Sequence, residues 1–317
     1  MRLALFLFFW LLFTASGQQP LTKSLPPRIA KTVREVLDKP YADTQNPRQR
    51  LDLILPSKPA SKAIPAIVFI HGGAWRQGNK RGGRRLLTPF VVSGRYVGVS
   101  VGYRLSQEAR WPAQIHDCKA AIRWIRANAK AYGIDPKKIA VWGTSAGGHL
   151  VSMLGVSENI EDLEGALGKH TNESSRVTCV ANYFGPSALL TMDDFPSSIT
   201  HNSSDSPESQ LIGGPIQEHK EKSQNASPIT HVTKDDAPFL HVHGDQDKLV
   251  PFNQSQVLDA ALDKAGVPSL LITMKDRGHG GFNSPELDTL LQRFFGLYLY
   301  DQSFSLEEQT LAPAPAR

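Results

Sequence analysis

The feature that most constrains the fold of this chain is the alternation of short apolar runs with helical patterns. Residues 66–70 read Ala-Ile-Val-Phe-Ile, a continuous apolar run typical of a strand buried on both faces. Residues 114–131 then carry apolar side chains at helical spacing, and Gly133 can end that helix in a left-handed conformation. Buried strands joined by helices predict a parallel sheet with crossover connections.

The pattern repeats along most of the chain. We expect strands at residues 50–55, 66–70, 96–101, 139–142, 177–183, 239–243 and 270–274, and helices at 114–131, 148–154, 254–265 and 285–300. This predicts an α/β fold with a mostly parallel sheet of about eight strands and helices on both faces. The 317 residues are long for one average domain, but α/β folds of this size commonly form a single unit, so we expect one domain over residues 48–302.

Three segments fall outside this rhythm. Residues 186–236 are rich in Ser, Asn, Asp and Pro, and are too long for a simple connection, which predicts an insertion or a cover over an active site. Residues 18–47 form a polar, Pro-containing lead that we expect to be partly ordered along the domain edge. Residues 303–317 are predicted to be a disordered tail.

The first 17 residues have the features of a secretory signal peptide. A basic start, Met1-Arg2, precedes an apolar run over residues 3–13 and then small residues up to Gly17. The run is short for a bilayer span. We therefore predict cleavage near Gly17, a secreted or periplasmic protein, and no stable membrane insertion after cleavage. An uncleaved anchor is the alternative.

Charge and cysteine content narrow the function classes. The 35 Lys and Arg are offset by 30 Asp and Glu, and the densest basic group, residues 80–85, is expected to be solvated surface. Nothing resembles a nucleic-acid-binding module, so we predict no nucleic-acid partner. Cys118 and Cys179 are expected to be unrelated core thiols, although the sequence does not determine whether they bond. Their spacing is not that of a metal site, and we predict no metal. The oligomeric state is left open.

Ser145 is the predicted nucleophile. Residues 143–147 read Gly-Thr-Ser-Ala-Gly and lie between an expected strand and an expected helix. A nucleophilic serine on such a strained turn needs glycines on both sides, where side chains would collide with the strand and helix. The alternative is a glycine-rich turn that merely contains a serine.

A serine hydroxyl needs a base, and the base needs an orienting carboxylate. Asp247 directly follows an expected buried strand, at the sheet edge where doubly wound folds place their chemistry. Asp245 is the alternative acid, although we expect it to stabilise the turn. His279, after the last expected strand, is the predicted base, which gives the order Ser, Asp, His. Seven other histidines are expected to be surface or packing residues: His116, His149, His170, His201, His219, His231 and His241.

Backbone amides are predicted to stabilise an oxyanion. Residues 71–75 read His-Gly-Gly-Ala-Trp and follow the central strand, like the His-Gly-Gly-Gly loops of lipases and esterases. We expect donors from Gly72 or Gly73 and from Ala146, with His71 bracing the loop. Trp75, Tyr103 and Phe282 are candidate walls of the substrate pocket.

Taken together, residues 71–75, 121–125, 135–136, 143–148 and 243–251 give the chain a family resemblance. The chain resembles the hormone-sensitive-lipase-like and feruloyl/acetyl-xylan-type (BD-FAE-like) esterases of the α/β-hydrolase superfamily over roughly residues 41–300. The resemblance implies an α/β-hydrolase fold and a serine carboxylesterase without cofactor. For members with an early Leu-Asp-Leu strand, here Leu51 to Leu53, it implies short acyl groups, acetyl or feruloyl, on plant polysaccharide.

Two other functions remain open because a scaffold does not fix an activity. A dipeptidyl-peptidase-like serine peptidase would share every catalytic residue named above, although this chain is too short for the added propeller that such enzymes usually carry. A noncatalytic binding protein on a hydrolase scaffold is the third possibility. A lost triad member would mark such a protein, and the sequence retains all three.

Overall fold

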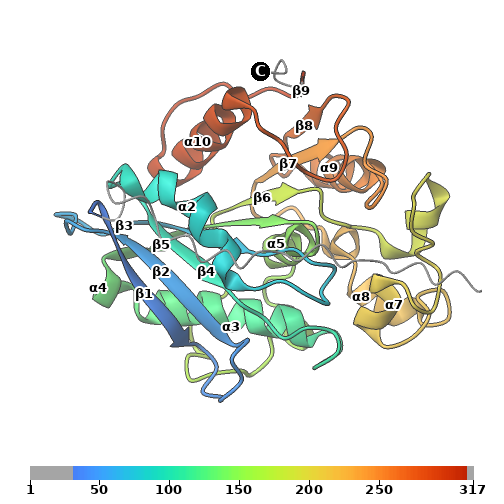
Figure 1. Cartoon of the computed structure of the whole chain (residues 1–317), viewed down its shortest axis with the longest axis horizontal. Helices are drawn as coiled ribbons and strands as arrows, with labels where there is room; N and C mark the ends of the chain where they lie inside the picture. Colours follow the sequence, from blue (N-terminus) through green and yellow to red (C-terminus); the bar gives the residue numbers. More distant parts are fainter. Residues whose placement is uncertain (1–30, 313–317) are drawn as a thin grey trace, which may run out of the picture.

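A nine-stranded, mostly parallel sheet forms the centre of the molecule (Figure 1). The computed structural model describes residues 31–312. The strands are β1 Val33–Pro40, β2 Arg50–Pro56, β3 Ile64–Ile70, β4 Val97–Val101, β5 Ile134–Thr144, β6 Cys179–Tyr183, β7 Phe239–Gly244, β8 Leu271–Met274 and β9 Gln309–Leu311. Their order across the sheet is β1-β2-β4-β3-β5-β6-β7-β8-β9. The first two pairings are antiparallel and all others are parallel.

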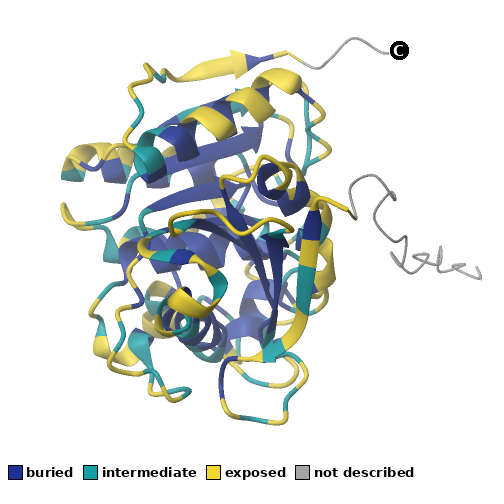
Figure 2. Ribbon diagram, turned by 90° about the vertical axis from the view of Figure 1, so that its left-hand side faces the viewer, coloured by how far each residue is buried: buried dark blue, intermediate teal, exposed yellow. Residues whose placement is uncertain are grey.

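Helices cover both faces of this sheet. The α-helices are α2 Gly83–Val92, α3 Ala113–Ala127, α4 Ala129–Tyr132, α5 Ala146–Val156, α6 Glu161–Glu164, α7 Pro207–Ile212, α8 Lys220–Asn225, α9 Asn253–Ala265 and α10 Pro285–Tyr300, with short 3-10 turns η1 Lys80–Gly82, η2 Leu189–Asp194 and η3 Pro228–His231. One apolar core joins the sheet to α3, α5 and α9, and a second joins its other face to α2 and α10. The central strands are buried along their length (Figure 2). This is the α/β-hydrolase fold predicted from the sequence.

The predicted strands and helices are present, most with small shifts at their ends, although β5 begins five residues before the predicted strand 139–142. The helix expected over residues 114–131 is interrupted, because α3 ends at Ala127 and the amide of Asn128 donates to the carbonyl of Trp124. The short α4 then ends at Gly133, which adopts the predicted left-handed conformation with φ of 68°.

Both ends of the domain contain more regular structure than the sequence predicts. Val33–Pro40, inside the expected lead segment 18–47, forms the edge strand β1 against β2. Gln309–Leu311, inside the expected disordered tail 303–317, pairs in parallel with β8, and Leu311 is buried. An edge strand is ordered by its pairing with the neighbouring strand, and its own composition does not reveal that pairing. Residues 1–30, including the predicted signal peptide, and residues 313–317 lie outside the described chain.

The prediction of a solvated basic surface at residues 80–85 is wrong for Lys80. Its ammonium is buried and lies 2.6 Å from an oxygen of Asp38 and 2.7 Å from an oxygen of Asp52. Arg84 pairs with Glu35 on β1. These contacts fasten the edge strand to the sheet, since a buried cation requires nearby carboxylates.

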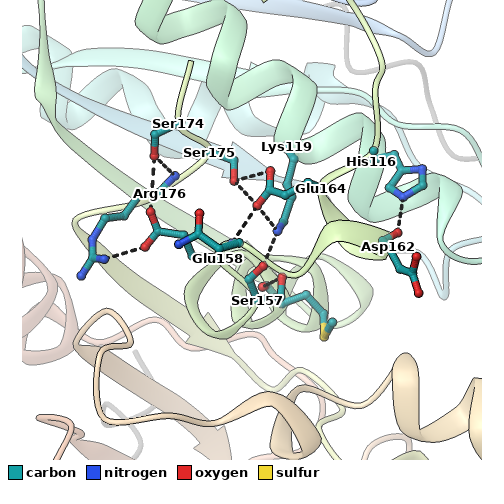
Figure 3. Close-up of polar contacts among 12 residues, drawn as sticks. His116, Lys119, Ser157, Glu158, Asp162, Glu164, Ser174, Ser175 and Arg176 are labelled. Atoms are coloured by element: carbon teal, nitrogen blue, oxygen red, sulfur yellow. Dashed lines mark hydrogen bonds and ion pairs between the residues drawn. The ribbon is translucent and has the colours of Figure 1, made fainter. Parts of the chain in front are cut away.

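Glu164 anchors the segment between α5 and β6 to α3 (Figure 3). Its carboxylate accepts hydrogen bonds from Lys119 at 2.6 Å, Arg123 at 3.1 Å and Ser175 at 2.8 Å. The Lys119 side chain is fully buried, and it also donates to the carbonyl of Ser157. Every charged member of this cluster therefore has a partner, as buried ionic groups require.

Cys118 and Cys179 are free, buried thiols, as expected. They belong to the apolar cores on opposite faces of the sheet, and burial raises the pKa of each thiol above its ordinary value. Among the helices of residues 31–312, none combines the length and apolar character needed to cross a bilayer.

Candidate active site

Ser145 occupies a strained turn between β5 and α5. Its φ of 54° and ψ of −123° lie outside the regions that residues with side chains favour. A Cβ atom added at Gly143 would lie 2.2 Å from the carbonyl oxygen of Gly147. A Cβ atom added at Gly147 would lie 2.1 Å from the carbonyl oxygen of Ile70. The turn therefore requires glycine at both positions, and it raises the serine above the carboxyl ends of the strands.

The three residues predicted as a triad lie in one line of hydrogen bonds. The Ser145 hydroxyl is 2.9 Å from Nε2 of His279. Nδ1 of the same imidazole is 2.7 Å from Oδ2 of Asp247. Asp247 is fully buried at its side chain and His279 is 18% exposed. The arrangement can orient the imidazole, accept the serine proton and stabilise the resulting imidazolium.

Asp247 receives hydrogen bonds at both oxygens. Oδ1 accepts the backbone N–H groups of Leu249 at 2.8 Å and Val250 at 3.1 Å, and Oδ2 lies near two histidines. Burial alone would raise the pKa of Asp247, but hydrogen bonds from His243 and His279 hold it well below its ordinary value. The carboxylate therefore stays ionised at neutral pH.

Asp245, the alternative acid, holds the turn. Its Oδ1 accepts the backbone N–H of Asp276 at 2.7 Å, which joins the loop after β7 to the loop after β8 that carries His279. Within the described chain, the hydrogen bonds of His279 go to Asp247 and Ser145. The structure thus places Asp245 in the role expected of it.

His243 is a neighbour of the site that sequence reasoning missed. Its Nε2 lies 3.1 Å from Oδ2 of Asp247 and 3.0 Å from the carbonyl oxygen of Val250, while Nδ1 lies 2.8 Å from the hydroxyl of Ser255. Because both neighbours of Nε2 are acceptors, this nitrogen carries the proton and the serine hydroxyl donates to Nδ1. The available signal was its place at the end of a buried strand, four residues before Asp247.

The predicted oxyanion loop lies beside the serine turn. A Cβ on Gly72 would lie 2.6 Å from the carbonyl oxygen of Thr144, next to Ser145, so only a glycine allows this approach. Gly73 has a φ of 118°, and its carbonyl accepts the N–H groups of Arg76 and Gln77. His71 donates from Nδ1 to the Gly72 carbonyl at 2.8 Å, and burial lowers the pKa of His71 to about 4. The backbone amide of Ala146 begins α5 next to the serine.

A small cavity opens at Ser145. Its volume is about 90 Å³. The predicted insertion supplies one wall and the loop after Asp247 another, and the lining residues are Ala74, Trp75, Ser145, Ala146, Pro186, Ile199, Pro207, Glu208, Leu249, Val250 and His279. Glu208 is the one carboxylate in this lining, and it was not anticipated from the sequence. The segment 186–236 therefore covers the serine.

Of the three candidate pocket walls, only Trp75 lines this cavity. Tyr103 is fully buried: its ring stacks on His71 and its hydroxyl donates to the His71 carbonyl at 2.9 Å. Phe282 packs against Phe184 with ring centres 5.4 Å apart, and Phe184 in turn contacts the His279 ring at 4.6 Å. Tyr103 and Phe282 thus support the loop and the imidazole from behind, and the prediction that they line the pocket is wrong.

One group of carboxylates in residues 31–312 has a spacing that could hold a metal ion. Oxygens of Asp259, Asp263 and Glu308 lie within 4.8 Å of one another. Burial is the main cause that raises the pKa of Asp259 to about 6. The three residues come from α9 and from the segment before β9, neither of which lines the Ser145 cavity.

Comparison with known proteins identifies esterases as the chain's relatives. The BD-FAE family model matches residues 51–262. The esterase LipC of Mycobacterium tuberculosis is 34% identical over 217 residues, which are 68% of this chain and 52% of LipC, so the chain spans about half the length of that relative.

Comparison with solved structures of similar fold also finds an esterase. A truncated form of a carbohydrate esterase from gut microbiota superposes with a TM-score of 0.79 at 33% identity, over 86% of this chain and 98% of that one. A bifunctional GH43-CE protein of Bacteroides eggerthii gives a TM-score of 0.77 at 34% identity, over 83% and 38% respectively.

Proposed function

The chain belongs to the BD-FAE family, and from this membership we propose that it is a serine esterase, hydrolysing carboxylic esters through an acyl-enzyme on Ser145. The observation that carries the proposal is the continuous contact from the Ser145 hydroxyl through His279 to Asp247. A serine, an imidazole and a buried carboxylate in this geometry are the parts that nucleophilic acyl transfer needs.

In the proposed mechanism, His279 takes the proton of Ser145 as the hydroxyl oxygen attacks the ester carbonyl. Asp247 keeps Nδ1 protonated and stabilises the imidazolium. The backbone amides of Ala146 and of Gly72 or Gly73 stabilise the developing oxyanion. The imidazolium then donates its proton to the departing alcohol, and a water molecule, deprotonated by His279, releases the acid from Ser145.

The size of the cavity supports a short acyl group. Pockets that enclose drug-sized ligands usually have about 300–1,000 Å³, whereas the cavity at Ser145 has about 90 Å³. A cavity of this size favours an acetyl group over a feruloyl group, whose aromatic ring needs more room. We therefore propose acetyl esters as the preferred substrates, ahead of feruloyl esters.

Two observations favour a carbohydrate as the alcohol part of the ester. Of the two structural neighbours described above, one is named a carbohydrate esterase and the other a bifunctional GH43-CE protein. The signal-peptide pattern of residues 1–17 also fits a protein exported to where plant polysaccharide is found. We propose acetylated polysaccharide as the substrate class and secretion or periplasmic export as the location. The mass of the mature N-terminus tests the export proposal: a chain that retains Met1 contradicts it.

The proposal is tested with p-nitrophenyl esters and purified protein. The wild type should hydrolyse p-nitrophenyl acetate, and Ser145→Ala should retain only background. Activity should fall steeply from acetate to longer acyl chains, and p-nitrophenyl ferulate should be a poor substrate. Equal rates for the wild type and Ser145→Ala would refute the esterase. A chain active only on dipeptide amides would favour the peptidase alternative.

A further inference from the structure

Glu208 is a buried carboxylate in the wall of the Ser145 cavity that the proposed mechanism does not use. It lies in the first turn of α7, within the segment that covers the serine. Its side chain is 3% exposed. Apart from Ser145, His279 and Glu208, the residues that line the cavity are apolar or aromatic. A carboxylate in such a lining requires an explanation, because burying a charge is costly.

The protein provides little compensation for this carboxylate. Nδ1 of His201 lies 3.1 Å from Oε2 of Glu208, and that side chain is 1% exposed. Neither atom has a hydrogen-bond partner of good geometry. Nε2 of His201 is 3.1 Å from the hydroxyl of Ser197. Within residues 31–312, Glu208 therefore has one ion-pair contact and an unused capacity to accept hydrogen bonds, which buried carboxylates normally fill.

The contact with His201 indicates which kind of substrate group can bind to the Glu208 carboxylate. The imidazole of His201 already lies beside the carboxylate, with Nδ1 3.1 Å from Oε2. A cationic substrate group would have to lose its hydration in a cavity lined mainly by apolar residues, which is costly. A neutral donor, such as a hydroxyl, fills the free acceptor positions without adding charge to an apolar cavity.

We propose that Glu208 is a specificity-determining residue that accepts a hydrogen bond from a hydroxyl carried by the substrate close to its ester group. This rests on the proposed esterase function and adds the chemical class of its substrates. The hydroxyl can belong to the acyl group, as in a hydroxyacyl ester, or to the carbon next to the esterified one, as in a sugar. A site built around a buried acceptor discriminates strongly against substrates that lack the donor.

Two matched substrate pairs distinguish these sources. Ethyl glycolate and ethyl acetate differ by a hydroxyl on the acyl group. 2-Hydroxyethyl acetate and 2-methoxyethyl acetate differ by a hydroxyl donor on the alcohol. Hydrolysis is followed by acid release at constant pH. In the wild type, kcat/KM should be about tenfold or more higher for the hydroxyl-bearing member of at least one pair, since hydrogen bonds to charged groups are strong.

Variants test whether Glu208 causes the preference. Glu208→Gln keeps the shape with a weaker acceptor and should reduce the preference. Glu208→Leu combined with His201→Phe replaces both partners by apolar groups, avoids an orphaned imidazole and should abolish it. Circular dichroism and urea unfolding check that both variants fold, and the ratio of kcat/KM within each substrate pair measures the preference. Glu221→Gln, an exposed position on α8, is the matched control and should keep the full preference.

The outcomes separate this inference from the esterase proposal. Ethyl acetate hydrolysis that depends on Ser145 supports the esterase whatever happens at Glu208. If the wild type shows no preference in either pair, or if the preference survives in the double variant, the role of Glu208 is wrong while the esterase stands. If no ester is hydrolysed, both are wrong.

Discussion

Glu164 and Glu208 lie in two consecutive segments that leave the sheet, the first between α5 and β6 and the second between β6 and β7. Glu164 accepts hydrogen bonds from Lys119, Arg123 and Ser175, and its side chain remains 26% exposed. Glu208 is 3% exposed, and among residues 31–312 its one ion-pair contact is with His201. The first carboxylate anchors a loop to a helix, whereas the second leaves acceptor capacity facing a cavity. The more deeply buried carboxylate is the one with less compensation, which is the reverse of what stability alone would favour.

Asp247 shows that hydrogen bonding alone does not separate structure from chemistry. Two backbone amides and two imidazoles surround it, so it is as well compensated as Glu164. The difference lies in its partners: an imidazole that reaches Ser145 can move a proton, and the cations on Glu164 cannot. The comparison therefore predicts different losses when each carboxylate is changed.

The largest effect is expected for Asp247→Asn. The amide no longer stabilises an imidazolium and can favour the wrong tautomer of His279, so turnover should fall by about four orders of magnitude. The measurement is kcat with p-nitrophenyl acetate. Asp245→Asn is the matched control, because the Asp245 carboxylate accepts the backbone N–H of Asp276 and so serves the turn, and it should keep most of the activity. Near-full turnover of Asp247→Asn would remove this residue from the mechanism.

Glu164→Gln should lower stability and leave chemistry intact. The change leaves the fully buried Lys119 and the buried Arg123 without their counter-charge, a loss of about 3–5 kcal/mol for a broken buried pair. Urea unfolding measures the free energy, and kcat should stay within about twofold. Glu158→Gln breaks the more exposed pair with Arg176 and should cost at most about 1 kcal/mol. A large fall in kcat for Glu164→Gln would contradict the purely structural role assigned to Glu164.

His243→Phe should produce an intermediate loss. It removes one donor from Oδ2 of Asp247, and hydrogen bonds to charged groups are worth about 1.5–3 kcal/mol, so kcat should fall about 10- to 100-fold. His243 acts through Asp247 and is a positioning residue. His243→Gln, whose amide can donate, should recover part of kcat at unchanged KM. If the two variants lose equal activity, the packing of the ring matters and the hydrogen bond does not.

The smallest effect at neutral pH concerns acid stability through His149, a buried imidazole that contacts Trp75 in the cavity wall. It accepts the indole N–H of Trp75 and donates to the Ala226 carbonyl, and burial lowers its pKa to about 4. The ordinary pKa of this imidazole is 6.5, so between pH 6.5 and pH 4 His149 is protonated in the unfolded chain and neutral in the folded chain. The contribution of His149 to the free energy of unfolding is therefore fully present above pH 6.5. It falls by about 1.4 kcal/mol per pH unit down to pH 4.

The variant His149→Gln isolates this contribution. Urea unfolding at several pH values should give a shallower acid slope than the wild type, whatever the variant's stability at pH 7. His170→Gln, at a half-buried histidine in the segment between α6 and β6, is the control and should keep the wild-type slope. Identical slopes for the His149 variant and the wild type would mean that this imidazole becomes protonated in the folded state.

The sequence predicts the interior of the fold better than its edges. The apolar run of β3 and the Gly-x-Ser-x-Gly turn are explained by local physics, because burial on both faces and close backbone contacts permit few other residues. β1 and β9 depend on pairing with β2 and β8, which composition does not encode.

The site shows a similar division. The order of Ser145, Asp247 and His279 along the chain identified residues that the fold brings into contact. His243 and Glu208 were missed for different reasons. His243 reads as one more strand residue, and Glu208 lies in an insertion without periodicity, where its burial depends on the path of the segment. Tyr103 was misassigned because a sequence position does not reveal on which side of a loop a ring lies.

The Lys80 contacts with Asp38 and Asp52 have a consequence for self-association. They hold β1 as the outermost strand, and the pairing of β1 with β2 is interrupted between Val36 and Lys39. An irregular, charged rim offers a second molecule no continuous row of amide and carbonyl groups on which to add a strand. The opposite rim, β9, has only three residues. Both rims thus discourage the edge-to-edge stacking through which sheet proteins aggregate.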